Sequence, residues 1–248
     1  MRLDGKRALI TGPAQGLGEQ MAYALAAEGC DIVGFDIRMD QLTAVMERIQ
    51  RMGRRATGLE VDVRDFQAVQ DAVSRVYDDW GSLDILVNNA GKGQRQPFTE
   101  VTWDNWKYML DVNLTSVFNL CHAVVPHMIE QGSGRIVNLS SVSAVRGGRL
   151  LGRTAYAAAK GGVIGLTKSL AYELAPHKIT VNCIAPGVQN TPRRAKDTPE
   201  EHAHLIANIP MREIGEPSDL AQTVVFFCLP TSRHITGVVL CQDGGHAI

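Results

Sequence analysis

A tyrosine and a lysine four residues apart, Tyr156 and Lys160, have the clearest chemical potential in this sequence. Residues at this spacing share one face of a helix, so the phenol and the ammonium would lie side by side. An unperturbed tyrosine has a pKa of about 10, but a neighbouring positive charge favours the phenolate and lowers that pKa. The pair therefore predicts a general acid/base, although the same spacing also occurs in many helices without any function.

Two serines upstream of the tyrosine are candidates to hold a reacting oxygen. Ser141 ends the stretch Asn138-Leu-Ser-Ser141, and Ser143 follows two residues later. The apolar residues before Ser141 predict a strand, and the helix that carries Tyr156 comes next in the chain. Serine and tyrosine can therefore converge at the carboxyl edge of a parallel sheet, where ligands bind in open α/β folds.

A glycine-rich turn follows the first apolar stretch of the chain. Gly12, Gly16 and Gly18 have the spacing Gly-x-x-x-Gly-x-Gly. Glycines let the backbone approach a pyrophosphate, and the helix that follows supplies N–H donors and a partial positive charge. The pattern predicts a dinucleotide site, and a plain tight turn between a strand and a helix is the alternative.

The end of the second apolar stretch carries Asp36, eighteen residues after Gly18. An acidic residue about 20 residues past the last glycine is placed to accept hydrogen bonds from the adenosine ribose. Its charge would repel a 2′-phosphate, which predicts NAD rather than NADP as the cofactor. Gln15 is uncharged and offers no partner to such a phosphate, and we interpret Arg38 as a solvated surface residue.

Short apolar stretches alternate with amphipathic ones, which predicts an α/β fold with a doubly wound parallel sheet and helices on both faces. Strands are expected at 7–11, 31–36, 56–61, 83–87, 135–140, 179–184 and 238–241. Helices are expected at 16–28, 40–52, 65–79, 103–131, 154–174 and 218–229. The irregular, proline-containing segment 187–216 is expected to be a substrate loop or lid. Composition does not shift along the chain, so residues 1–248 are expected to form a single domain.

The composition excludes several other classes of protein. The 25 Lys+Arg and 26 Asp+Glu nearly cancel, which argues against a dedicated nucleic-acid binder. The longest apolar run, 224–229, is far too short to span a membrane, and the N-terminus lacks the apolar core of a signal peptide. The five cysteines are scattered without a metal-ligand or disulfide pattern. These features predict a cytoplasmic protein without a metal, acting on a small molecule.

Together the motifs resemble those of the short-chain dehydrogenase/reductase family, over nearly the whole chain and in the family's order. The matching segments are Thr11-Gly12…Gly16-Leu17-Gly18, Asp62-Val63, Asn88-Asn89-Ala90-Gly91, Asn113 in Asp-Val-Asn-Leu, Ile136 to Ser141, Tyr156…Lys160 and Pro186-Gly187…Thr191. The resemblance implies a seven-stranded Rossmann-like fold, in a branch of the family that prefers NAD.

The resemblance also implies a role for each site residue. Tyr156 would exchange a proton with the substrate oxygen, and Ser141 would hydrogen-bond that oxygen. Lys160 would lower the phenol pKa and hold the nicotinamide ribose, while Asn113 would anchor a water that relays protons to Lys160. The implied cofactor-binding residues are Gly12, Gln15, Gly16, Leu17, Gly18, Asp36, Asp62, Val63, Asn89, Ala90, Gly91, Tyr156, Lys160, Pro186, Gly187, Gln189 and Thr191.

The sequence departs from the family pattern at three positions. Ser143 lies thirteen residues before Tyr156, the usual spacing, whereas Ser141 lies fifteen before it. We favour Ser141 because it matches the local Asn-x-Ser-Ser pattern. Gln189 stands where the family usually has an apolar residue beside the nicotinamide, and Pro13 removes one N–H from the glycine turn.

Arginines gather in the segments expected to rim the pocket. No acid occurs between Glu130 and Glu173 or between Pro186 and Lys196, so these arginines have no local acidic partners in the sequence. One hypothesis is that some of them, together with Ser143, contact an anionic substrate. The alternative, which the usual exposure of arginine favours, is that they are solvated or lie at subunit contacts. The candidates for substrate binding are Arg149, Arg193 and Arg194.

The predicted function is hydride transfer between NAD(H) and a secondary alcohol or ketone, with Tyr156 moving the proton. An NADP-dependent 3-oxoacyl-thioester reductase is one alternative, and Asp36 argues against it. A non-catalytic dinucleotide sensor is another, and the complete catalytic set argues against that. The family resemblance implies a homotetramer built from the long helices at 103–131 and 154–174 and the C-terminal strand.

Overall fold

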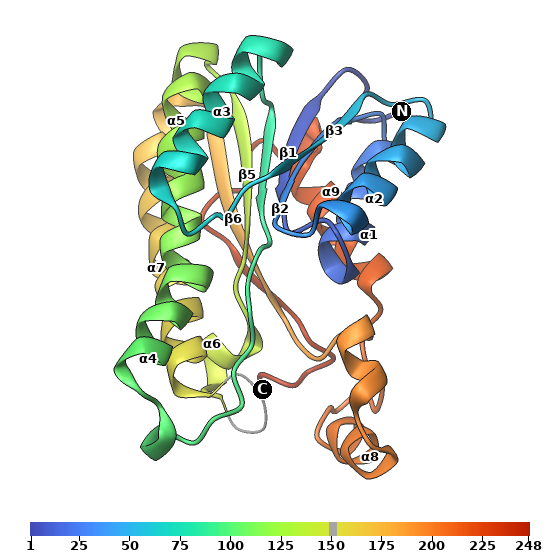
Figure 1. The fold of residues 1–248 in the computed structure, drawn as a ribbon, viewed down its shortest axis with the longest axis vertical. Helices are drawn as coiled ribbons and strands as arrows, with labels where there is room; N and C mark the ends of the chain where they lie inside the picture. Colours follow the sequence, from blue (N-terminus) through green and yellow to red (C-terminus); the bar gives the residue numbers. More distant parts are fainter. Residues whose placement is uncertain (149–152) are drawn as a thin grey trace.

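One parallel sheet of seven strands organises the computed structural model, which describes residues 1–148 and 153–248 (Figure 1). Its strand order is β3-β2-β1-β4-β5-β6-β7. This architecture confirms the predicted doubly wound α/β fold. The strands are β1 (Arg7–Thr11), β2 (Asp31–Asp36), β3 (Ala56–Glu60), β4 (Ile85–Asn88), β5 (Gly134–Leu139), β6 (Ile179–Pro186) and β7 (Val239–Gln242).

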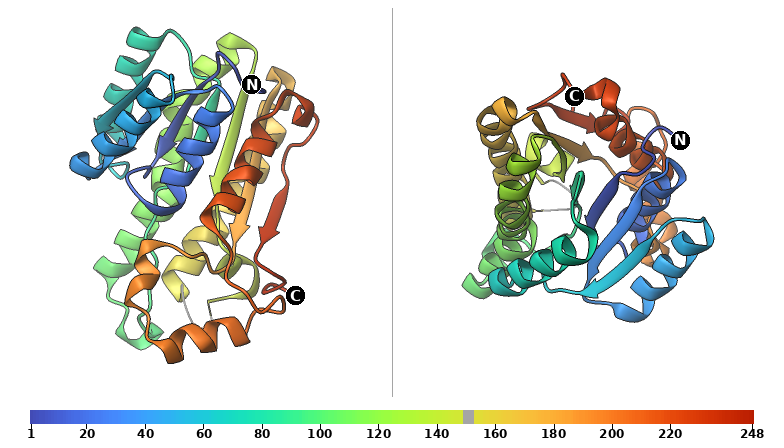
Figure 2. Two further views of the ribbon diagram at one scale, coloured as in Figure 1. Left: turned by 90° about the vertical axis from the view of Figure 1, so that its right-hand side faces the viewer. Right: turned by 90° about the horizontal axis from the view of Figure 1, so that it is seen from above.

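Helices cover both faces of this sheet. One layer contains α3, α5 and α7, and the opposite layer contains α1, α2 and α9, as Figures 1 and 2 show. The helices are α1 (Gly16–Ala27), α2 (Met39–Arg51), α3 (Phe66–Trp80), α4 (Trp103–Leu110), α5 (Ser116–Gln131), α6 (Val142–Arg146), α7 (Thr154–Leu174), α8 (Pro199–Ala207) and α9 (Pro217–Cys228).

The middle of β1, Ala8 to Ile10, shows why the central strands of this sheet are apolar on both faces. Ala8 and Ile10 pack in the core cluster formed with α1 and α9. Leu9, between them, faces the other way and packs with α3 and α5. Successive side chains of a strand point to opposite faces, and both faces are covered, so these three successive positions are all apolar.

The helix expected over 103–131 is interrupted by a π turn at Asp111–Thr115, between α4 and α5. Asn113 lies within this turn and is fully buried. A π turn changes the backbone hydrogen bonding of one helical turn, and such turns are frequent at functional sites. The spacing of apolar residues does not predict this π turn, because the helical segments α4 and α5 follow directly on either side of it.

The expectation that segment 187–216 is irregular is wrong, because it contains a 3₁₀ turn at Pro192–Lys196 and the helix α8. Thr198 caps α8 by accepting from the backbone N–H of Glu201, whose carboxylate accepts from the N–H of Thr198. This reciprocal capping box, with Pro199 at the first helical position, is a helix start signal that is visible in the sequence Thr-Pro-Glu-Glu.

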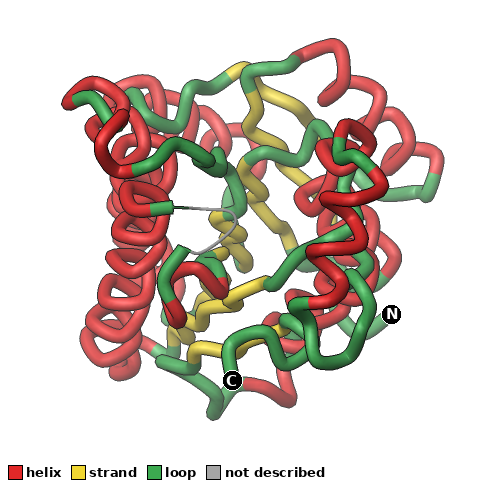
Figure 3. Tube along the Cα trace, turned by 90° about the horizontal axis from the view of Figure 1, so that it is seen from below, coloured by secondary structure: helices red, strands yellow, loops and turns green. Residues whose placement is uncertain are grey.

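The order of the strands places a crevice above one point of the sheet. The chain runs outward from β1 to β2 and β3, then returns to place β4 on the other side of β1. Connections on the two sides of this switch point diverge at the carboxyl ends of the strands, where ligands bind in such folds. Seen from below, this edge carries many of the connecting loops (Figure 3).

Candidate active site

A cleft of about 910 Å³ opens at this edge of the sheet. It is lined by the residues that follow β1, β2, β4, β5 and β6 and by segment 187–216. Every predicted catalytic, cofactor-binding or substrate residue lines it except Arg149, which lies outside the described residues. The structure therefore brings together residues that lie as far apart in sequence as Gly12 and Arg194.

The glycine turn is close-packed against the loop after β4. A Cβ atom built on Gly18 would lie 2.2 Å from the Gly12 carbonyl oxygen and 2.5 Å from Asn89 Nδ2. Asn89 Nδ2 donates to the carbonyls of Thr11 (2.9 Å) and Gly12 (3.2 Å). Gly12 and Gly16 have φ angles of 70° and 64°, which favour glycine. The turn thus leaves no room for a side chain at Gly18.

The carboxylate of Asp36 faces this turn. Its Oδ2 accepts from the backbone N–H of Ala14 at 3.0 Å, and its Oδ1 accepts from the N–H of Arg38 at 3.1 Å. The Arg38 side chain also donates to the carboxylate, with Nε 3.2 Å from Oδ1. The interpretation of Arg38 as freely solvated is therefore wrong, because the turn into α2 brings it back onto Asp36.

A second Asp-x-Arg pair lies beside the first. Arg64 Nε is 3.0 Å from both carboxylate oxygens of Asp62, and this hydrogen-bonded partner lowers the pKa of Asp62. Arg64 also lies over the ring of Tyr108, 5.1 Å from its centroid. Arg38, Arg64 and Tyr108 line the cleft and were not identified as site residues from sequence, although the repeated Asp-x-Arg spacing was visible.

Ser141 and Tyr156 meet in the cleft. The Ser141 hydroxyl caps α6 by accepting from the backbone N–H of Ser143 at 3.1 Å. Burial raises the pKa of the Tyr156 phenol, whereas a hydrogen bond with the Ser141 side chain and the positive charge of Arg193 act to lower it. The serine chosen from the local sequence pattern is thus in contact with the tyrosine.

Lys160 lies on the same helix as Tyr156 and hydrogen-bonds to the backbone at the end of β5. Its Nζ donates to the Leu139 carbonyl at 2.7 Å and lies 6.0 Å from the centroid of the Tyr156 ring. Burial lowers the pKa of Lys160 to about 8. Arg193 is a second cation near Tyr156, and its positive charge acts to lower the pKa of the phenol.

The side chain of Asn113 is fully engaged in holding the loop after β4. Its Oδ1 accepts from the backbone N–H of Lys92 at 3.0 Å, and its Nδ2 donates to the carbonyls of Lys92 (3.1 Å) and Met109 (3.0 Å). A Cβ built on Gly91 would lie 2.8 Å from Asn113 Oδ1 and 3.4 Å from Lys160 Nζ. The Asn113 side chain therefore ties the loop after β4 to α4.

Two arginines near the cleft, Arg95 and Arg194, have acidic partners that lie outside their own stretches of sequence. Arg194 Nη1 lies 2.6 Å from Asp197 Oδ2, and Arg95 pairs with Asp197 at 3.1 Å and with Glu201 at 3.6 Å. Asp197 directly follows the acid-free stretch 186–196. The 3₁₀ turn at Pro192–Lys196 folds it back onto Arg194. This pairing removes Arg194 as an independent candidate for substrate binding.

Gln189 is a polar residue in the wall of the cleft. It is buried, and a Cβ built on the neighbouring Gly215 would lie 2.6 Å from its Nε2. Within residues 1–148 and 153–248, its Oε1 has no hydrogen-bond partner. The departure from an apolar residue thus places an unpaired acceptor beside the cleft.

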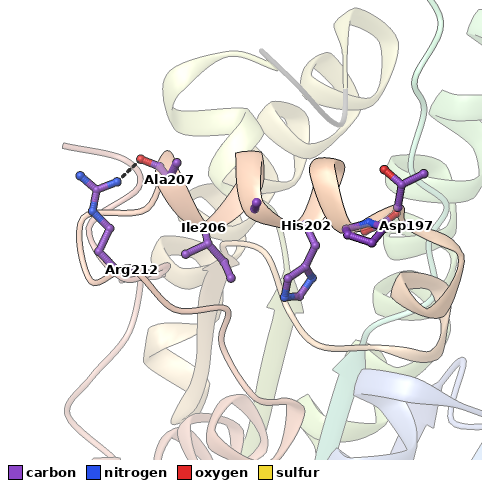
Figure 4. Close-up of a pocket in the computed structure, with 8 residues that line it drawn as sticks. Asp197, His202, Ile206, Ala207 and Arg212 are labelled. Atoms are coloured by element: carbon purple, nitrogen blue, oxygen red, sulfur yellow. Dashed lines mark hydrogen bonds between the residues drawn. The ribbon is translucent and has the colours of Figure 1, made fainter.

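A second, open hollow of about 710 Å³ lies along α8. Figure 4 shows His202 and Ile206 on one side of this helix, with Arg212 donating to the Ala207 carbonyl. None of the predicted catalytic residues lines it, so we assign the chemistry to the first cleft. In the part of the chain that the structure describes, no helix is long and apolar enough to cross a membrane.

Comparison with known proteins is consistent with this geometry. The family model described as Enoyl-(Acyl carrier protein) reductase matches residues 12–247. A 3-oxoacyl-[acyl-carrier-protein] reductase of Thermotoga maritima is 37% identical over 248 residues, with 100% of both chains covered. A 2-dehydro-3-deoxy-D-gluconate 5-dehydrogenase of Escherichia coli is also 37% identical, covering 98% of this chain and 96% of its own. The crystal structure of carveol dehydrogenase from Mycobacterium avium in complex with NAD superposes with a TM-score of 0.94 at 33% identity, covering 99% and 98% of the two chains.

Proposed function

Because the chain belongs to the short-chain dehydrogenase/reductase family of oxidoreductases, we propose that it transfers a hydride between NAD(H) and a secondary alcohol or its ketone. The observation that carries the proposal is the contact of Tyr156 with Ser141 inside the same cleft that the glycine turn lines. A dinucleotide fits these residues, because a Cβ at Gly18 would fill the turn and Asp36 stands at the end of β2.

The residues of the cleft divide the work of the reaction. A bound NAD accepts or supplies the hydride. In alcohol oxidation the Tyr156 phenolate takes the hydroxyl proton, and Ser141 donates a hydrogen bond to the same oxygen. Lys160 holds the nicotinamide ribose, and Asn113 positions the loop after β4 together with a proton-relaying water.

Turnover of a substrate panel tests this function. We expect NADH absorbance at alkaline pH to increase with at least one member of a panel of polyols, hydroxy acids, cyclic diols and sterols. The relative named 3-oxoacyl-[acyl-carrier-protein] reductase favours one alternative, so a 3-oxoacyl thioester with NADPH belongs in the panel. Cofactor binding without turnover of any compound would instead support a dinucleotide sensor.

NAD should be preferred over NADP by about tenfold or more in kcat/KM, because like charges brought together cost several kcal/mol and ~1.4 kcal/mol is tenfold. Asp36→Ala removes the carboxylate and should therefore bring the kcat/KM values for NAD and NADP closer together. Arg38→Ala is the matched control. It removes the cation that lies 3.2 Å from the carboxylate, so it should increase the preference for NAD over NADP. An equal or NADP-favouring ratio in the unaltered protein would contradict the role of Asp36.

We further propose that residues 1–248 form one catalytic domain in which segment 187–216 covers the cleft as a lid. The segment has its own small apolar cluster of Val188, Leu205 and Ile209, which holds α8 to the start of the segment. Arg95 then ties Asp197 and Glu201 of this segment to the loop after β4. These contacts suit a segment that moves as a unit over a bound substrate.

Light scattering at micromolar concentration should give four times the 27.0 kDa mass of the chain, because we propose a closed, symmetric homotetramer. Trp103 of α4, Phe118 of α5 and Tyr172 of α7 are 75%, 47% and 87% exposed, and we propose that they lie in the subunit interfaces. Leu166 and Leu170, in contrast, pack against the core and do not indicate an interface. A monomeric mass would contradict the proposal.

A further inference from the structure

We propose that Arg193 binds a carboxylate group of the substrate, and that this contact is coupled to proton transfer at Tyr156. The inference rests on the proposed dehydrogenase function and narrows its substrate class to hydroxy or oxo acids. It selects Arg193 from the three arginines, Arg149, Arg193 and Arg194, that the sequence alone could not distinguish.

Among Arg95, Arg193 and Arg194, only Arg193 has no acidic partner in the described part of the chain. Arg95 and Arg194 are paired with Asp197 and Glu201, as described above. Arg193 forms neither a hydrogen bond nor an ion pair with any residue of the described ranges 1–148 and 153–248, and the sequence between those ranges contains no acid. These three arginines share two acids, and Arg193 is the one outside the ion pairs.

Arg193 is also placed where a substrate would lie. It lines the cleft next to Thr191, and its guanidinium packs against the backbone after β4. A Cβ built on Gly93 would lie 2.4 Å from Arg193 Nη1. The residue remains partly exposed, so a ligand that enters the cleft can reach its planar set of donors.

The surroundings of Arg193 favour an anion. Burial lowers the pKa of the guanidinium, and the positive charges of Arg194 and Arg95 act in the same direction. An anion bound beside Arg193 would relieve both effects. One surplus charge on one planar fork suits a carboxylate better than a doubly charged phosphate monoester.

Two cations lie near Tyr156: Lys160 of α7, whose Nζ is 6.0 Å from the ring centroid, and Arg193 of segment 187–216, which lines the same cleft. The charge of Arg193 helps to lower the phenol pKa, so a carboxylate that neutralises it should raise that pKa in the substrate complex. Alcohol oxidation needs the phenolate, and its rate rises with pH through the phenol pKa. The kcat profile of a hydroxy acid should therefore lie at higher pH than that of its methyl ester.

The test compares three oxo acids, 3-oxobutanoate, 4-oxopentanoate and 5-oxohexanoate, with their methyl esters as substrates for NADH-dependent reduction. We expect a lower KM for at least one acid than for its ester. Arg193→Gln should raise the KM of that acid by about 10-fold to 100-fold, the value of a hydrogen bond to a charged group, with little change for the ester. Arg193→Lys should recover only part of the loss, because it keeps the charge but not the fork.

Two further variants separate recognition from a structural effect. Gly93→Ala displaces the Arg193 guanidinium while keeping its charge and should also raise the KM of the acid selectively. Arg51→Gln makes the same change in charge on α2, where the guanidinium pairs with Glu47 away from the cleft, and should leave the ratio of acid to ester KM unchanged. In the oxidation direction, the pH separation between hydroxy acid and ester should be present in the unaltered protein and absent in Arg193→Gln.

Calorimetric titration of 4-oxopentanoate and its ester into the protein, with and without NADH, gives a readout that does not depend on turnover. If esters are reduced as well as acids and Arg193→Gln changes neither, the carboxylate inference is wrong while the dehydrogenase function stands. If no compound is reduced but the acid binds in an Arg193-dependent way, the proposed function fails and the anion site stands. Preference for dihydroxyacetone phosphate over every oxo acid would assign the site to phosphate and overturn the inference.

Discussion

Replacing Tyr156 with phenylalanine should lower kcat by about 10³-fold, within the range attributed to a positioned general acid/base. The substitution removes only the phenolic oxygen, and the ring can keep its place in the buried wall of the cleft. NAD binding, measured by calorimetry, should therefore change little. A loss of this size in kcat with binding retained would separate proton transfer from cofactor positioning.

The pH dependence provides a second signature of Tyr156. Because burial raises the phenol pKa, alcohol oxidation by the unaltered protein should increase toward alkaline pH, and this limb should disappear in Tyr156→Phe. Tyr23→Phe is the matched control, since Tyr23 lies on α1 and donates to Glu19 rather than facing the cleft. If Tyr156→Phe kept more than about a tenth of kcat, another group would have to move the proton.

The fold was predictable from sequence because local patterns and packing agree. The strand Arg7–Thr11 and the helix Thr154–Leu174 have the expected bounds, since apolar residues at a regular spacing must be buried on a definite face. The capping box at Thr198 is also visible in the sequence, so the start of α8 could have been predicted. The π turn at Asp111–Thr115 had no such signal, because it depends on packing around Asn113.

Which residues gather in the site was predictable, whereas their electrostatic pairing was not. The positions of Gly18, Asp36 and Tyr156 follow from motifs that mark strand ends and helix starts. The partners of charged groups depend on where turns fold back, which placed Arg38 on Asp36 and Asp197 on Arg194. For the same reason, the sequence could not show that the positive charge of Arg193 also acts to lower the Tyr156 pKa.

Ser141→Ala should lower kcat by about 10²-fold or more, because it removes a donor to the oxygen on which charge develops. Ser143→Ala is the matched control. The two serines are close in sequence and both line the cleft, but Ser143 holds Ser141 through its backbone N–H, which alanine retains. The effect of Ser143→Ala should therefore be smaller.

A loss of stability must be separated from a loss of catalysis, because the Ser141 hydroxyl also caps α6 and such a cap contributes about 1 kcal/mol. Thermal unfolding of the two alanine variants measures the loss of stability. Ser141→Thr keeps a hydroxyl, so it should restore both the cap of α6 and much of the activity. The usual family spacing favours Ser143, whereas the contact between the Ser141 and Tyr156 side chains favours Ser141. A larger loss of kcat in Ser143→Ala than in Ser141→Ala, with similar unfolding temperatures for the two variants, would contradict this assignment. Ser143 would then be the serine that contacts the reacting oxygen.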